Sequence, residues 1–125
     1  MIEKLSISIW GRNFELPVNY NCYEGENVTE EQIQLLNKFI EHPEWIQTSK
    51  YIVENYCRQQ VLDDEENQKK DNIFSYIKPV SVFVKHVKKP KIALICKYRY
   101  DEEHGLAIMF DQEENITVGS EDIIL

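Results

Sequence analysis

Residues 80–100 read VSVFVKHVKKPKIALICKYRY, and this stretch decides the fold class. Apolar side chains recur at every second position over residues 80–84 and again over residues 92–100. A period of two is typical of a β-strand that buries one of its faces. The two strands are connected by the short segment Lys88-Lys89-Pro90. Because this connection is short, we expect them to pair antiparallel.

The same alternation continues towards the C-terminus. Residues 106–110 and 116–118 each predict a further strand, and residues 101–105 and 111–115 are short enough to be tight connections. Four consecutive strands with short links predict an antiparallel meander. The apolar ending at residues 123–125 is expected to be buried against it.

The N-terminal region predicts a β-hairpin. Residues 5–9 and 14–20 alternate in the same way, and Gly11-Arg12-Asn13 supplies residues that tolerate a turn. Because Pro17 lacks a backbone N–H, the second of these strands is expected to lie at a sheet edge.

Two helices are predicted between the hairpin and the meander. Thr29-Glu30-Glu31-Gln32 matches a capping box, and His42-Pro43 ends that helix and lets Pro43 open the next one. The apolar stripe expected on the first helix consists of Ile33, Leu36, Phe39 and Ile40. The face expected on the second consists of Trp45, Ser49, Ile52, Tyr56 and Gln59, with Ile46, Val53 and Cys57 beside it.

Together these elements predict one α+β domain over residues 1–125. It comprises an N-terminal β-hairpin, an αα-hairpin and a four-stranded antiparallel meander, with the helices packed on one face. The polar run at residues 63–72 is expected to be a solvated linker inside this domain.

Composition narrows the function classes. The 125 residues carry a formal net charge of −8, and 42 % are apolar, which suffices for one core. The longest uncharged apolar runs are far too short to span a membrane, and the start of the chain does not resemble a secretory signal.

Three cysteines without short spacing argue against a disulfide framework or a zinc site, so we expect a cytoplasmic protein that needs no cofactor. These are Cys22, Cys57 and Cys96, of which Cys22 is expected to be exposed.

The densest polar cluster is the connection Asp101-Glu102-Glu103-His104. Three carboxylates and an imidazole could bind a divalent cation or act as general acid and base. The alternative is a hairpin loop that Gly105 closes in a left-handed conformation. No nucleophile motif or phosphate-binding loop accompanies the cluster, so no catalytic or metal-ligating residue is assigned, and these four are candidate binding residues only.

Charge is unevenly distributed along the chain. Seven basic residues and no acidic one lie between positions 78 and 99, namely Lys78, Lys85, Lys88, Lys89, Lys91, Lys97 and Arg99. This basic segment could contact nucleic acid, but an acidic protein repels a polyanion at long range, so nucleic acid is the less favoured partner. The acidic loops favour a basic protein partner instead.

Two segments carry a resemblance to a known family. Residues 100–108 (YDEEHGLAI) and 118–125 (VGSEDIIL) resemble a bacterial family of uncharacterised domains, in which a W/Y-D-x-E-H-G-L-x-I-x-F hairpin precedes a closing G-x-x-D-I-x-L. The resemblance covers residues 76–125 and implies a fold family without implying a reaction. Similar small acidic domains occur among immunity proteins of bacterial toxin systems, which is an analogy.

The sequence therefore predicts a non-enzymatic domain that binds another protein. The alternative is an enzyme that binds a metal or a small ligand through residues 101–104. A homodimer formed through the apolar C-terminus is a further option.

Overall fold

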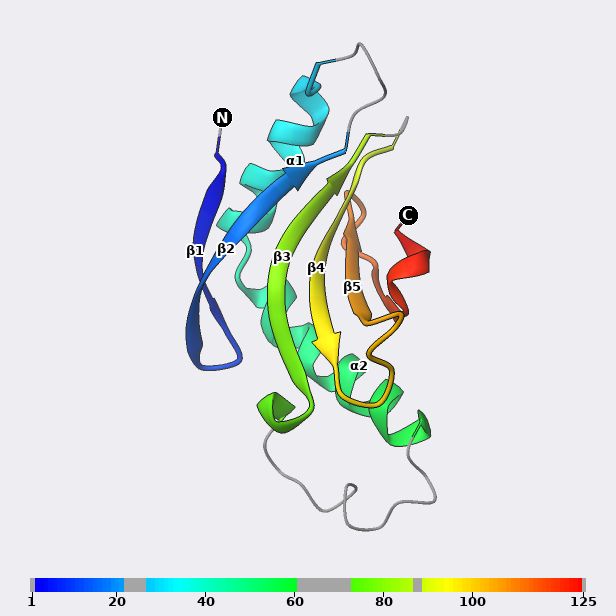
Figure 1. The fold of residues 1–125 in the computed structure, drawn as a ribbon. Helices are drawn as coiled ribbons and strands as arrows, with labels where there is room; N and C mark the ends of the chain where they lie inside the picture. Colours follow the sequence, from blue (N-terminus) through cyan, green and yellow to red (C-terminus); the bar gives the residue numbers. More distant parts are fainter. Residues whose placement is uncertain (1, 22–26, 61–72, 87–88, 125) are drawn as a thin grey trace.

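A computed structural model describes residues 2–21, 27–60, 73–86 and 89–124 (Figure 1). In chain order the elements are β1 (Lys4–Ile9), β2 (Arg12–Tyr20), α1 (Glu30–Glu41), α2 (Glu44–Gln60), the 3₁₀ turn η1 (Ile73–Ser75), β3 (Ile77–Lys85), β4 (Lys91–Tyr98), β5 (Leu106–Asp111), β6 (Ile116–Gly119) and the 3₁₀ turn η2 (Glu121–Ile123). The strands form one sheet in the order β1-β2-β3-β4-β5-β6, and both helices cover the same face of it (Figure 1). The predicted α+β class is confirmed.

The predicted hairpin and the predicted four-stranded meander, for which no mutual pairing was expected, are joined in the structure. β2 pairs with β3 in parallel, with Val18 opposite Val82 and Tyr20 opposite Val84, so the hairpin and the meander share one six-stranded sheet. The two helices form the crossover that a parallel pair requires. β2 is consequently an inner strand, and the edge position predicted for it belongs to β1. Pro17 is tolerated in the inner strand β2 because the pairing of β2 with β3 begins one residue later, at Val18.

The first hairpin turns one residue earlier than predicted. β1 ends at Ile9 and β2 begins at Arg12, so Trp10 and Gly11 are the two central residues. Their φ angles are +49° and +88°, the positive pair that two-residue hairpins favour. The indole N–H of Trp10 donates to the Ile46 carbonyl at 2.9 Å, which ties the turn to α2 and holds a large residue in this unusual conformation.

The predicted capping box starts α1. The Thr29 hydroxyl accepts from the Gln32 backbone N–H at 3.2 Å, and Gln32 Oε1 accepts from the Thr29 N–H at 2.9 Å. The buried face of the helix is rotated from the predicted stripe, because Ile33 and Ile40 are 36 % and 39 % exposed. The residues buried instead are Gln32, Leu35, Leu36 and Phe39.

Gln32 explains this rotation. Its Nε2 donates to the backbone carbonyls of Asn21 at 2.9 Å and Val84 at 3.1 Å, at the ends of β2 and β3. The side chain is fully buried, and the two bonds turn this face of α1 towards the sheet. The sequence assigned Gln32 to the capping box alone, because the partners that bury its side chain come from another part of the chain.

α2 completes the core on the same side of the sheet. Its buried residues are Trp45, Ile46, Ser49, Val53 and Cys57, whereas Ile52 and Tyr56 of the predicted face are half-buried. The Trp45 ring stacks near Phe110 of β5, with centroids 6.1 Å apart. Within the described residues no helix is long and apolar enough to cross a membrane.

The opposite face of the sheet is partly covered by the end of the chain. η2 folds over β4 and β5, where Ala93, Ala107 and Ile124 are buried and form a small second cluster (Figure 1). Burial of the apolar ending is thus confirmed for Ile124, whereas Leu125 lies outside the described residues, as does the predicted linker at residues 63–72. This arrangement places η2 beside the connection between β4 and β5.

Candidate functional site

Asp101 organises the connection between β4 and β5. Its backbone N–H donates to the Tyr98 carbonyl at 3.2 Å, and its own carbonyl accepts from the Gly105 N–H at 2.8 Å. Its carboxylate Oδ1 accepts from the His104 backbone N–H at 3.2 Å and lies 3.0 Å from the His104 ring Nδ1. The loop is therefore a defined turn that one aspartate holds from both ends.

The two segments of the resemblance meet in space at this loop. The Glu121 N–H donates to the His104 carbonyl at 3.1 Å, which attaches η2 to the loop. Gly105 has a φ of +64°, and a Cβ there would lie 2.6 Å from Glu121 Oε1 and 2.9 Å from the Cys96 carbonyl oxygen. The close approach of η2 and β4 thus requires glycine at this position.

This contact gathers five carboxylates on one corner of the molecule. We call Asp101, Glu102, Glu103, Glu121 and Asp122, together with His104, the acidic corner. All four predicted binding residues belong to it, and η2 adds two carboxylates. Among the described residues none of the five forms an ion pair with a lysine or arginine, and Asp101 pairs with His104.

The acidic corner raises the pKa of His104 above its ordinary value. The hydrogen bond from the imidazole to Asp101 is the main cause, and the charges of Asp101, Glu103 and Asp122 act in the same direction. All of these groups favour the protonated, positively charged ring. Because the ring is half exposed, its titration reports on this surface directly.

We expect the Asp101→Asn variant to lower the pKa of His104 towards the ordinary value of about 6.5. A raised folded-state pKa means that the stabilisation is fully present below the unfolded-state value and is lost as pH rises through the folded one. An NMR titration of the His104 ring measures the shift directly. Glu15→Gln, a distant charge change of the same size, should leave it in place, and equal shifts in the two variants would contradict the assignment.

The geometry of the acidic corner does not assemble a known catalytic arrangement. Asp101 and His104 have the contact of a base and its orienting carboxylate, but no serine, threonine or cysteine of the described residues hydrogen-bonds to the ring. Within the same residues, no group of three or more His, Cys, Asp and Glu side chains is placed to hold a metal ion. Chemically, the corner offers hydrogen-bond acceptors and negative charge.

The described thiols are core residues. Cys57 and Cys96 are 3 % and 0 % exposed. Burial raises the pKa of the Cys57 thiol to about 11 and also raises that of Cys96, so both stay protonated at neutral pH. Cys22, the thiol expected to be exposed, lies outside the described residues.

A second surface feature escaped the sequence analysis. A hollow of about 510 Å³ lies where β3 begins and β4 ends, and three of its lining residues are the cations Lys78, Lys97 and Arg99. All three belong to the basic segment, which was a signal in the sequence. The sequence alone does not single out these three, because only the strand register shows which residues of the segment converge.

Comparison with known protein families identifies the family of this chain. The sequence model of the family "Domain of unknown function (DUF6985)" matches residues 2–125. The chain belongs to this family. The DUF6985 match includes both helices and the first hairpin, so it extends well beyond the segment at residues 76–125 that carried the resemblance. No curated protein and no solved structure matched this chain.

Proposed function

We propose that this DUF6985 domain is a non-enzymatic module that binds a basic protein through the acidic corner. The observation that carries the proposal is a set of five carboxylates without lysine or arginine partners in the described structure. Three lie on a turn whose backbone hydrogen bonds fix its shape, and two lie on η2, which a backbone hydrogen bond attaches to that turn. Gathering like charges costs electrostatic energy, and a cationic partner relieves that cost. An immunity-like role, in which the domain covers a toxin, is one form that such binding would take.

A rigid acidic surface suits this role for kinetic reasons as well. Charge complementarity accelerates encounter and orients the partner before contact. The turn that carries Glu103 is attached to η2 by a backbone hydrogen bond, so little ordering is needed on binding. The net charge of −8 acts in the same direction as the local charge.

We expect a double variant, Glu103→Gln with Asp122→Asn, to weaken partner binding about tenfold. Both side chains contribute to the field at His104, and neither provides the hydrogen bonds that Asp101 gives to the loop. The matched control is Glu15→Gln with Glu41→Gln, which removes the same charge from exposed positions on β2 and α1. The tagged chain is used to capture partners from its host lysate, and the affinity of the purified partner is then measured by titration.

Salt provides the second readout. Binding of the wild-type chain should weaken as ionic strength rises from about 0.05 M to about 0.5 M, because exposed charges are then screened within a few ångströms. A partner that binds the corner variant and the control variant equally well, or whose affinity ignores salt, would contradict the proposal.

A further inference from the structure

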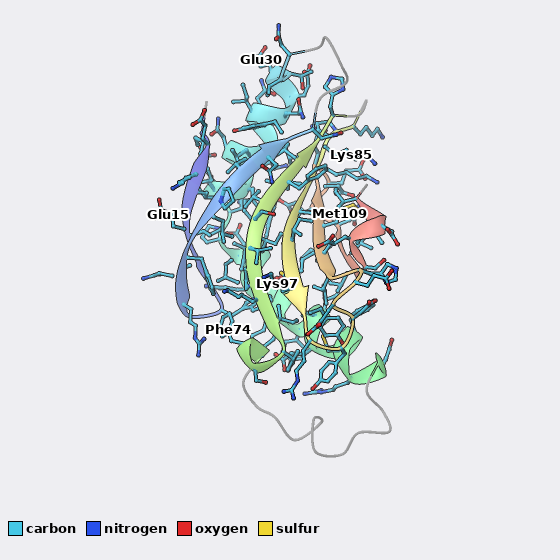
Figure 2. All side chains as sticks on the ribbon, viewed as in Figure 1. Glu15, Glu30, Phe74, Lys85, Lys97 and Met109 are labelled. Carbon is cyan, nitrogen blue, oxygen red and sulfur yellow. The ribbon has the colours of Figure 1, made fainter. Side chains whose placement is uncertain are left out.

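The hollow between the start of β3 and the end of β4 has the composition of an anion site. Its volume of about 510 Å³ lies within the range of small-molecule pockets, roughly 300–1,000 Å³. Among the residues that line it are Phe74, Tyr76, Lys78, Lys97, Arg99 and Glu102. Three cations against one carboxylate give this part of an acidic protein a local positive charge. Figure 2 shows Lys97 near the end of β4 and Phe74 at η1, both at this end of the sheet. Phe74 itself packs against the core on the helix side, beside Trp10 and Phe14.

The strand register places two of these cations in direct opposition. Lys78 of β3 pairs with Lys97 of β4, and both are exposed between buried neighbours, so their side chains share the solvent face. Like charges at directly opposite positions destabilise a sheet. At the other end of these strands Lys85 pairs with Lys91. The repulsion between these two lysines is offset there, because Lys91 also pairs with Asp111 of β5.

Lys97 has no carboxylate opposite it on β5. The pairing of β4 with β5 stops at Cys96, so no residue of β5 lies opposite Lys97. Within the described part of the chain, Lys78, Lys97 and Arg99 form no ion pair with a carboxylate. Arg99 is held at the rim by its backbone N–H, which donates to the Tyr76 carbonyl at 2.9 Å. The guanidinium of an arginine placed in this way can contact two phosphate oxygens at once.

We propose that this hollow binds a phosphorylated small molecule, with Lys78, Lys97 and Arg99 contacting its phosphate groups. Arginine can bind two phosphate oxygens at once and lysine binds phosphate as a point charge, and the negative charge of a phosphate relieves the repulsion between the opposed lysines. Tyr76 provides apolar lining for an organic portion, and beside it the Arg12 guanidinium covers the Phe74 ring, 4.4 Å from its centroid. Glu102 can accept a hydrogen bond from a ligand hydroxyl. The proposal does not rest on protein binding at the acidic corner, with which the hollow shares Glu102.

Calorimetric titration of the full chain in phosphate-free buffer tests the proposal, with pyrophosphate, ADP and adenosine as probes. We expect heat from pyrophosphate and ADP and none from adenosine. Tighter binding of ADP than of pyrophosphate would identify an organic phosphate as the preferred source of the anion, and the reverse order would identify an inorganic one. Binding of adenosine as tight as that of ADP, or no binding of either phosphate compound at millimolar concentration, would overturn the proposal.

Single substitutions distinguish binding at this hollow from nonspecific attraction of the anion to positive charge. Lys97→Gln and Lys78→Gln should each weaken ADP binding about fivefold to tenfold. Each should also raise the Tm of the unliganded chain by about 1–2 °C, because the cross-strand repulsion is removed. Glu102→Gln should tighten binding. Lys50→Gln, which removes the same charge from an exposed position on α2, should change neither quantity, and a loss of affinity equal to that of Lys97→Gln would overturn the proposal.

Discussion

Replacing Gly105 by alanine is expected to lower the free energy of unfolding by about 3 kcal/mol. Part of this loss is the cost of a left-handed φ of +64° in a residue with a Cβ. The larger part is steric, because the new Cβ would lie 2.9 Å from the Cys96 carbonyl oxygen of β4. A strand backbone inside the sheet cannot move aside as the nearby Glu121 side chain can.

Gly11→Ala is the matched control for this prediction. Gly11 also has a positive φ, +88°, but nothing lies within 4 Å of the position its Cβ would take. Only the conformational cost remains, so we expect a loss of about 1 kcal/mol. Urea unfolding followed by tryptophan fluorescence measures both variants. Equal losses would mean that the close packing between the loop and β4 contributes nothing to stability.

Replacing Gln32 by leucine is expected to cost about 3 kcal/mol as well. The side chain is fully buried. Its Oε1 accepts from the N–H of Thr29, the N-cap of α1, and its Nε2 donates to the carbonyls of Asn21 and Val84. Leucine fills a similar volume but leaves these backbone groups without their partner. The penalty therefore comes from unsatisfied polar groups and not from a cavity.

Gln34→Leu on the same helix isolates this effect. Gln34 is exposed and its side chain bonds only the Glu30 carboxylate among the described residues, so we expect a change within about 0.5 kcal/mol. The same unfolding measurement compares the two variants. If Gln32→Leu were as well tolerated, the bonds to Asn21 and Val84 would not be what orients α1 on the sheet.

The proposed sites carry opposite charge and share one loop. Glu102 belongs to the acidic corner and also lines the cationic hollow, on the other side of the turn that Asp101 holds. Their tests remain separate, because Glu103 and Asp122 do not line the hollow, and Lys78 and Lys97 are not part of the corner. Protein binding and phosphate binding can therefore fail independently.

Local patterns in the sequence predicted most individual elements correctly. The capping box at Thr29 and Gln32 was recognised because its residues lie three apart, and the strands of the meander were recognised from their period of two. The loop at residues 101–104 was predicted as a turn closed by Gly105, which has the expected positive φ. Each of these features depends on neighbours within a few positions along the chain.

The features that the sequence analysis missed all depend on distant pairs. The parallel contact of Val18 with Val82 merged two predicted units into one sheet, and the carbonyl of Val84 selected the buried face of α1. The opposition of Lys78 and Lys97 appears only when the register is known.

The sequence by itself determined which segments are helices, strands and turns, because hydrogen bonds within a turn and side-chain periodicity are set by adjacent residues. Only the tertiary structure decided which of these segments lie together, and with it the acidic corner and the cationic hollow. The physical reason is that a one-residue change of register moves every side chain of a strand to the opposite face. Composition is unchanged by such a shift, whereas the residues that converge on a site are replaced.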